Sequence, residues 1–420
     1  MRGGITALVV CVPLLLVAGG YAWTRDEPVS AEVSQWQQQV QLATGESRAY
    51  LYLSGLDAPV DQQPEALGAM RLQHYERWIE SREDVTDVNF VAPVVPVITL
   101  PEGELFCSIE AAGCFETLLA QAGELAATDD KHRVLRERYQ DLLALSDYRT
   151  LTSISLAEPI PPLIVMSKGQ QLFNLHVLDL ALNGQGAVAQ ASLQLELAQL
   201  RWYLARADNL VLKMLMGSLV SRNLEWQARL YRGGLTTQPA FPAPFNEAER
   251  SLLMPMQREF FGIAQMYEHL KDSFSGYERF AQQLFFRPQM TINAALAPYL
   301  RGAQLSQLAP DDFAVAFDEQ PPVQPEAGGL RNRVGNILLR VGTPEMPVYV
   351  GRIQDLEAKR RLLVVLATLP PGEFDEGHLQ WSPAARNPYY PTRQAKPDGQ
   401  GQLCFGGPLQ AFRNGRCVPL

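Results

Sequence analysis

The stretch NLVLKMLMGSLVSRNLEW, residues 209–226, is apolar around nearly its whole helical circumference. A helix that is hydrophobic on all sides is buried, so this stretch predicts a helix at the centre of the protein. Lys213 is the exception within it, because its i+3, i+4 and i+7 neighbours are Met216, Gly217 and Val220. A buried ammonium must find a carboxylate or lose its proton. The stretch therefore predicts both a core helix and an unusual lysine.

Two further segments of helical periodicity precede this helix. The three segments run from Leu163 to Leu182, from Val188 to Ala207 and from Leu210 to Tyr231. Only residues 183–186 (NGQG) and residues 208–209 (DN) separate them. Joints this short place consecutive helices antiparallel. The sequence thus predicts a mainly α fold built around three antiparallel helices.

The flanking sequence predicts more helices and two kinds of break. Helices are expected at 29–41, 64–81, 114–125, 135–143, from Asn246 onward, 290–308 and 347–369. Asn246 and Glu249 form a capping pair, and Pro255 is expected to kink or break the helix that follows. Three prolines in residues 91–107 predict an extended crossing. The proline-rich residues 318–329 are the predicted domain boundary, which divides the chain into a 28–320 helical body and 321–370 C-terminal helices.

The C-terminal residues 371–420 differ from the rest, being rich in Pro, Gly and Asn. Short strands are expected at His378–Trp381 and Gln402–Phe405, and Asn414-Gly415 is a two-residue turn signal. A small β appendix is therefore expected on the helical body.

Four cysteines lie in two local pairs, Cys107 with Cys114 and Cys404 with Cys417. An even number of cysteines in an exported chain suggests disulfides, and we expect each cysteine to pair with its neighbour in the sequence. Neither pair has the C-x-x-C spacing of a zinc site, and no histidine is near, so no metal site is predicted.

Residues 1–27 predict a membrane anchor. The run from Ile5 to Trp23 contains nineteen residues without a charge, which as a helix roughly spans a ~30 Å hydrocarbon core. Arg2 precedes the run, which favours a cytoplasmic N-terminus. A secretory signal cleaved near Ala22 is the alternative, because Gly20-Tyr21-Ala22 offers small residues at the positions that signal peptidase recognises. Both possibilities export the rest of the chain.

Composition and motifs limit the function. The chain has 420 residues, is 47% hydrophobic and has a formal charge of −9, which argues against a nucleic-acid partner. The densest basic run, Lys359-Arg360-Arg361, is expected to be a solvated helix face. The nucleotide-binding, serine-hydrolase and H-E-x-x-H motifs are missing, so we predict no cofactor.

Some side chains are nevertheless candidates for catalysis. His176 and Asp179 are three residues apart and share a helix face, where the carboxylate could orient the imidazole as a general base. Lys213 is a candidate base or nucleophile, with Glu196 or Asp179 as its expected partner. A structural histidine and a structural ion pair are the competing interpretations.

A loop near the C-terminus is a candidate binding site. Residues 386–399, RNPYYPTRQAKPDG, place Tyr389 and Tyr390 beside Arg386 and Arg393. Exposed aromatic and cationic side chains can bind a peptide, glycan or protein, although the tyrosines could equally pack the loop onto the body.

Three segments resemble a group of proteobacterial envelope proteins that have a single membrane anchor and no known activity. They are residues 47–68 (SRAYLYLSGLDAPVDQQPEALG), residues 200–224 (LRWYLARADNLVLKMLMGSLVSRNL), and NPYY at 387–390 followed by LCFGGP at 403–408. The resemblance implies a bacterial inner-membrane anchor and a helical periplasmic body, and it implies no activity.

The function expected from these features is that of a tethered scaffold or assembly protein of the cell envelope, with other envelope proteins as partners. Two alternatives remain open. One is an envelope hydrolase that uses Lys213 with Asp179, His176 or Glu196. The other is a carrier of an apolar ligand, which requires a cavity between the central helices.

Overall fold

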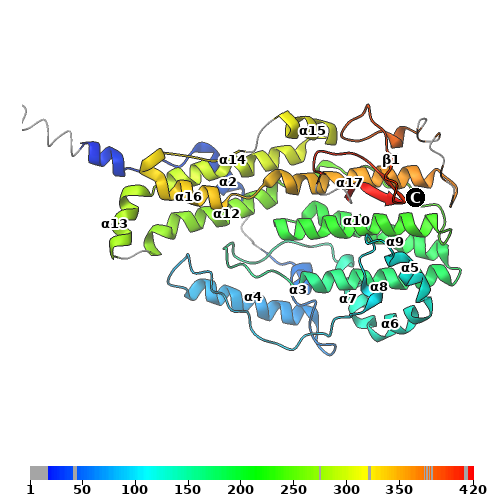
Figure 1. Cartoon of the computed structure of the whole chain (residues 1–420). Helices are drawn as coiled ribbons and strands as arrows, with labels where there is room; N and C mark the ends of the chain where they lie inside the picture. Colours follow the sequence, from blue (N-terminus) through cyan, green and yellow to red (C-terminus); the bar gives the residue numbers. More distant parts are fainter. Residues whose placement is uncertain are drawn as a thin grey trace, which may run out of the picture.

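The structure is a computed structural model that describes residues 18–40, 45–273, 276–319, 323–372, 374, 377, 379, 382–410 and 415–420. The fold is mainly α-helical, as expected, with a small three-stranded sheet near the C-terminus (Figure 1). The predicted anchor Ile5–Trp23 lies mostly outside the described residues, and residues 18–24 are helical. Among the helices that the structure describes, none is both long and apolar enough to cross a membrane.

The α-helices outside the central bundle have the following bounds: α2 (Ala31–Gln39), α3 (Arg48–Ser54), α4 (Pro64–Ser81), α5 (Cys114–Ala120), α6 (Leu125–Lys131), α7 (Arg133–Ala144), α11 (Glu247–Arg250), α12 (Leu253–His269), α13 (Gly276–Phe285), α14 (Pro288–Gln307), α15 (Pro310–Glu319), α16 (Arg333–Gly342) and α17 (Met346–Ala367). Short 3-10 helices are η1 (Glu104–Phe106), η2 (Ala122–Glu124), η3 (Leu270–Ser273), η4 (Gly329–Asn332) and η5 (Pro383–Ala385).

The three predicted central helices are confirmed. They are α8 (Leu163–Leu182), α9 (Gly186–Arg206) and α10 (Leu210–Arg232), and consecutive members pack on each other. Asn209 caps α10, because its side-chain oxygen accepts a hydrogen bond of 2.9 Å from the Leu212 amide. Helix α10 is largely buried, because α8, α9, α12 and α17 pack around it.

Helix α17 packs against both α10 and α14 and is the second buried helix of the protein (Figure 1). The prediction that Lys359-Arg360-Arg361 forms a solvated face is wrong, because Lys359 is fully buried and Arg360 is 8% exposed. The tail and neighbouring helices cover α17 on several sides, so little of its circumference faces solvent. The helices before and after residues 318–329 share one hydrophobic core, and the division at that linker stays a prediction.

Helix α12 begins two residues before Pro255. Asn246 and Glu249 form the expected capping box of the short helix α11. The chain leaves the helical conformation at Ser251, and α12 starts at Leu253. Pro255 therefore lies in the first turn of α12, where its missing N–H is tolerated. The break precedes the proline by a few residues.

The N-terminal part of the body is confirmed in its main features. Helix α4 begins at Pro64 and ends at Ser81, as expected, and packs closely against α3. Residues 88–103 form neither helix nor strand, which agrees with the predicted extended crossing. The crossing is held by a 2.8 Å hydrogen bond from the Ile98 amide to the Asp57 carbonyl oxygen.

The C-terminal sheet contains β1 (Lys396–Pro397), β2 (Gln402–Cys404) and β3 (Cys417–Pro419), which pair antiparallel in that order. Cys404 lies directly opposite Cys417 in the register and forms a disulfide with it. The expected turn at Asn414 and most of the expected strand His378–Trp381 lie outside the described residues.

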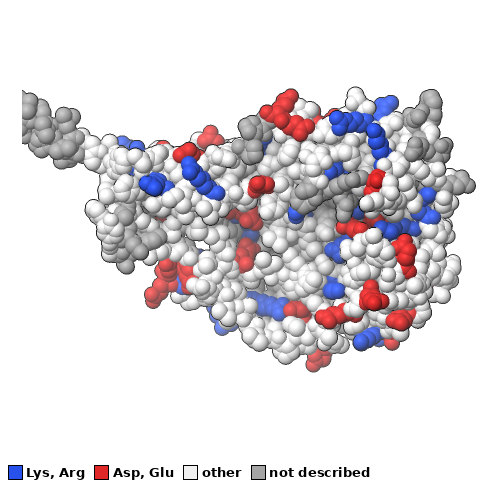
Figure 2. Space-filling model, viewed as in Figure 1, with Lys and Arg blue, Asp and Glu red and all other residues white. Residues whose placement is uncertain are grey.

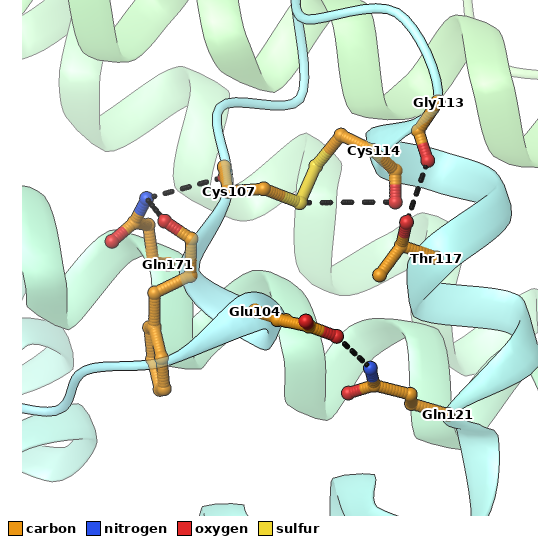
Figure 3. The surroundings of a disulfide bond; sticks show 8 residues. Glu104, Cys107, Gly113, Cys114, Thr117, Gln121 and Gln171 are labelled. Carbon is orange, nitrogen blue, oxygen red and sulfur yellow. Dashed lines mark hydrogen bonds between the residues drawn. A yellow bond between two sulfur atoms is a disulfide. The ribbon is translucent and has the colours of Figure 1, made fainter.

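The second disulfide joins Cys107 to Cys114, so nearest-neighbour pairing is confirmed for both. Figure 3 shows the disulfide joining the segment before α5 to the first residue of α5, with Gln171 of α8 next to it. The Gln171 side chain donates to the carbonyl oxygens of Phe106 and Cys107, at 3.2 and 3.5 Å. The Cys107–Cys114 loop is therefore part of the body and is not a free appendage.

Candidate functional site

Lys213 is buried as predicted, with an exposed fraction of 1%. Its ammonium donates to the Leu204 carbonyl at 2.7 Å and to the Ala248 carbonyl at 3.4 Å. Burial lowers the pKa of Lys213 to about 7, and the negative charge of Glu249 opposes this shift. The expected pairing with Glu196 or Asp179 is wrong, because the hydrogen bonds of Lys213 go to backbone carbonyls. Leu204 is in the last turn of α9, where backbone carbonyl groups have no hydrogen-bond partner within the helix. The ammonium of Lys213 therefore supplies a donor for one of these carbonyl groups.

Glu196 lies in a separate buried network. Asn223 donates to it at 2.7 Å and Gln170 at 3.2 Å, and the Tyr139 hydroxyl also donates to it. Burial raises the pKa of Glu196 to about 7, and these donors only partly offset that effect. The network therefore connects α7, α8, α9 and α10 by hydrogen bonds within the core.

His176 and Asp179 do not face each other across their helix. His176 Nδ1 is 3.0 Å from Asp129 on α6, while the Asp179 carboxylate accepts a hydrogen bond from Asn183 at 3.1 Å. Arg136 also binds Asp129, at 2.5 Å. Burial alone would raise the pKa of Asp129, but the hydrogen bonds from His176 and Arg136 hold it below its usual value. The imidazole is thus oriented by Asp129, and the four candidates belong to separate contact sets.

The tail residues are held against the body. Tyr389 is buried, and its hydroxyl donates to Asp355 of α17 at 2.5 Å. Tyr390 is half-buried, donates to Asp318 at 3.3 Å, and lies 4.8 Å from the guanidinium of Arg393. Arg386 and Arg393 are exposed. Packing therefore accounts for Tyr389, and a binding role for the other three stays a prediction.

A buried ion pair connects the tail to α17. Arg416 is 1% exposed and donates to both oxygens of Asp355, at 3.0 and 3.1 Å. Burial raises the pKa of Asp355 to about 6, and the charge of Arg416 opposes the rise. This pair fixes β3 and its disulfide to the helical core.

Helix α17 carries a second buried charge cluster. The Lys359 ammonium lies 3.1 Å from Glu225 and 3.4 Å from Glu110, and donates to the Ser221 hydroxyl at 3.1 Å. Arg229 binds the other oxygen of Glu225 at 2.9 Å. The sequence did not indicate this cluster, because α17 contains six charged residues and such a helix is ordinarily expected to face solvent.

A candidate binding site with exposed apolar side chains is a surface groove between residues 154–163 and the helices α10 and α12. Its volume is about 230 Å³. Leu156, Ile160 and Val211 line it and are 47%, 66% and 43% exposed. We call this site the 154–163 groove. Its signal in the sequence is the apolar, proline-rich run LAEPIPPL at 156–163, which alone does not distinguish a binding site from an ordinary connecting loop.

A buried ion pair forms the floor of the groove. Arg258 is 7% exposed and donates to Glu158 at 2.8 Å and to the Thr152 carbonyl at 2.9 Å. Burial raises the pKa of Glu158, and the charge of Arg258 opposes the rise. Glu259 lies beside them, and burial together with the charge of Glu158 raises its pKa also. The groove thus combines an apolar rim with a floor formed by the Arg258–Glu158 ion pair and the neighbouring Glu259.

Charged side chains of both signs are interspersed on the face shown in Figure 2, which is hollowed near its centre. Among the described residues, no group of three or more His, Cys, Asp or Glu side chains is arranged to hold a metal ion.

Comparisons with protein-family models, with curated proteins and with solved structures find no match to this chain. The structure itself shows a mainly α-helical, disulfide-bonded protein with an apolar surface groove. The two disulfides indicate an oxidising, extracytoplasmic compartment.

Proposed function

We propose that this chain is a membrane-tethered scaffold or assembly protein of the bacterial cell envelope, whose body lies in the periplasm. In this proposal the 154–163 groove binds an extended segment of a partner protein. The N-terminal apolar run Ile5–Trp23 is the tether, and the disulfides support the location of the body.

The observation that carries the proposal is the exposure of apolar side chains over a fixed charged floor. The groove volume of about 230 Å³ is below the roughly 300–1,000 Å³ that is typical of small-molecule sites, so it suits one or two side chains of a peptide. Leu156 and Ile160 offer apolar contact, and Glu259 adds a carboxylate beyond the Arg258–Glu158 pair, which favours a nearby cation. The expected partner segment therefore combines an apolar with a basic side chain.

Site-specific photocrosslinking in living cells tests this proposal. A photoreactive amino acid at Ile160 or Leu156 is expected to give one discrete adduct with an envelope protein. Val188 on α9 is the matched control, because it is 51% exposed and lies outside the groove. Gly262 of α12 borders the groove, where a Cβ would lie 3.6 Å from Ile154. The Gly262→Leu variant should fill the groove and abolish the adduct. An adduct that is unchanged in this variant, or equal at Val188, contradicts the proposal.

The hydrolase alternative gains no support from the placement of its candidates. Lys213, Glu196 and His176 are each held by different partners, and none of them lines the 154–163 groove. The carrier alternative requires space between the central helices, where the Glu196 network lies. The tethered scaffold is therefore the function that we propose.

A further inference from the structure

We propose that one end of the body rests on the membrane surface, with aromatic and aliphatic side chains of residues 18–24, α13 and η4 in the lipid interface. We call these elements the membrane-facing end. This inference rests on the proposed tether and adds the orientation of the body relative to the bilayer.

The stem that follows the apolar run is fixed to this end by hydrogen bonds. The Trp23 indole donates to the Leu284 carbonyl of α13 at 2.8 Å, and Arg287 donates back to the Trp23 carbonyl at 3.1 Å. Arg331 of η4 donates to the Arg25 carbonyl at 2.7 Å. Because these bonds come from two separate elements, the body cannot swing freely about the stem.

The same stem is also joined to α14. Both carboxylate oxygens of Asp26 accept hydrogen bonds from backbone amides at the start of α14, at 2.9 Å from Gln289 and 3.0 Å from Met290. The negative charge lies at the positive end of the helix dipole, which stabilises the contact. Residues 23–26 thus form a rigid connection between the tether and the body.

Large apolar side chains are exposed around this connection. Tyr277 and Phe280 of α13 are 83% and 57% exposed, Leu330 of η4 is 68% exposed, and Tyr21 is 66% exposed. Tyr277 and Phe280 are three residues apart, so they share one face of α13. Helix α13 packs against α16 and η4, and Figure 1 places α13 and α16 at the end of the molecule where residues 18–24 project. The apolar side chains therefore gather where the tether leaves the body.

The position of the apolar run identifies lipid as the occupant of this surface. Residues 5–17 immediately precede the described stem and contain no charge. A spanning helix that ends near Trp23 places Tyr21 and Trp23 at the level of the lipid head groups, where Tyr and Trp are enriched. Since the body is fixed within a few residues of that level, the exposed side chains of α13 and η4 meet the same interface.

Charge at this end is mixed. Arg279 and Arg333 are exposed, and so is Asp272. The apolar side chains, more than the net charge, therefore account for the contact. Attachment should consequently depend little on the fraction of anionic lipid.

Depth-dependent fluorescence quenching on the full-length protein tests the inference. A Cys11→Ser background removes the cysteine outside the two disulfide pairs, and an environment-sensitive dye is attached after Phe280→Cys or Leu330→Cys. The matched control is Leu195→Cys, because Leu195 is 62% exposed and belongs to α9, which Figure 1 labels at the end of the molecule opposite α13. The proteins are reconstituted into phosphatidylcholine vesicles that contain nitroxide lipids labelled near the head group. Flotation of the vesicles reports whether each protein is membrane-bound.

We expect every variant to float, with quenching at both test positions at least about twofold greater than at Leu195. If the proteins float but the three positions are quenched equally, the body does not rest on the membrane and the tether stands. If the proteins do not float, the tether is wrong, and the orientation is wrong with it.

Discussion

Lys213 and Lys359 are both buried ammonium groups, but their surroundings differ. Lys359 lies 3.1 Å from Glu225 and has a second carboxylate, Glu110, at 3.4 Å. Lys213 has two carbonyl partners and a more distant carboxylate, so burial lowers its pKa to about 7. A full countercharge offsets the loss of hydration, whereas neutral carbonyls do so only in part.

The Lys359→Met variant removes the charge and keeps most of the side-chain volume. We expect it to destabilise the protein by about 3–5 kcal/mol, because Glu225 is left buried with less compensation. Urea unfolding followed by circular dichroism measures the change. Arg133→Met is the control, because the Arg133 side chain is 59% exposed. An exposed ion pair contributes only about 0–1 kcal/mol to the free energy of unfolding. Similar losses in both variants would contradict the assigned burial of Lys359.

Glu196 makes stability depend on pH. Its pKa rises from 4.5 to about 7 in the folded protein, so the folded state retains a proton that the unfolded state releases between these values. Stability from this group is therefore complete below pH 4.5 and is lost as the pH rises through 7.

The Glu196→Gln variant should lack this loss. Relative to the parent, its free energy of unfolding should increase by about 3 kcal/mol between pH 4 and pH 8, given 1.36 kcal/mol per pKa unit. Urea unfolding at several pH values measures the difference between the two proteins. A difference that is constant across this range would show that folding does not raise the pKa of Glu196.

At the scale of helices, close approach of backbones depends on glycine. Helices α3 and α4 cross at Gly55 and Gly68, where an added Cβ would lie 2.0 Å from the Pro64 carbonyl oxygen and 1.9 Å from that of Leu51. Backbone atoms cannot move aside as a flexible side chain can, so these two positions require glycine. Gly262 of α12 differs, because its Cβ would make ordinary contacts of 3.6 and 3.8 Å.

Two alanine substitutions compare these positions. Gly68→Ala should destabilise the protein by at least about 1–3 kcal/mol, because the helices must separate. Gly262→Ala should stabilise it by about 0.5–1 kcal/mol, because alanine loses less backbone entropy in a helix. Thermal and urea unfolding measure both changes. A neutral Gly68→Ala would mean that α3 and α4 do not cross this closely.

At the scale of the whole molecule, the C-terminal tail is held by a covalent and an ionic link. The Cys404–Cys417 disulfide joins β2 to β3, and Arg416 binds Asp355 in the core. The tail therefore covers α17 and should unfold together with the body.

Thiol labelling of the protein from membranes tests both the disulfides and the tether. Under non-reducing conditions we expect one alkylated cysteine, Cys11, and after reduction four more, because Cys107, Cys114, Cys404 and Cys417 are paired. Mass spectrometry counts the labels. Cleavage near Ala22 would remove Cys11 and give none before reduction. Five labels without reductant would contradict the oxidising compartment.

The candidate site was the least predictable part of the molecule. His176 faces Asp129 of another helix instead of Asp179, which is three residues away in the sequence. Lys213 is bound by carbonyls of α9 and α11, and the 154–163 groove joins a loop with two helices. Each of these contacts joins elements distant in the sequence, so residue spacing could not identify them.

Local patterns alone determined the helical class, the three antiparallel helices around residues 209–226, the start of α4 at Pro64 and the pairing of the cysteines. Periodicity, capping, proline geometry and short chain separation are properties of neighbouring residues, which is why they could be predicted. The burial of Lys359, the groove, and the assembly of α13 and η4 beside the stem were decided only by the tertiary structure. These features depend on which helix faces which, and that is set by packing between segments that lie from about fifty to more than two hundred residues apart.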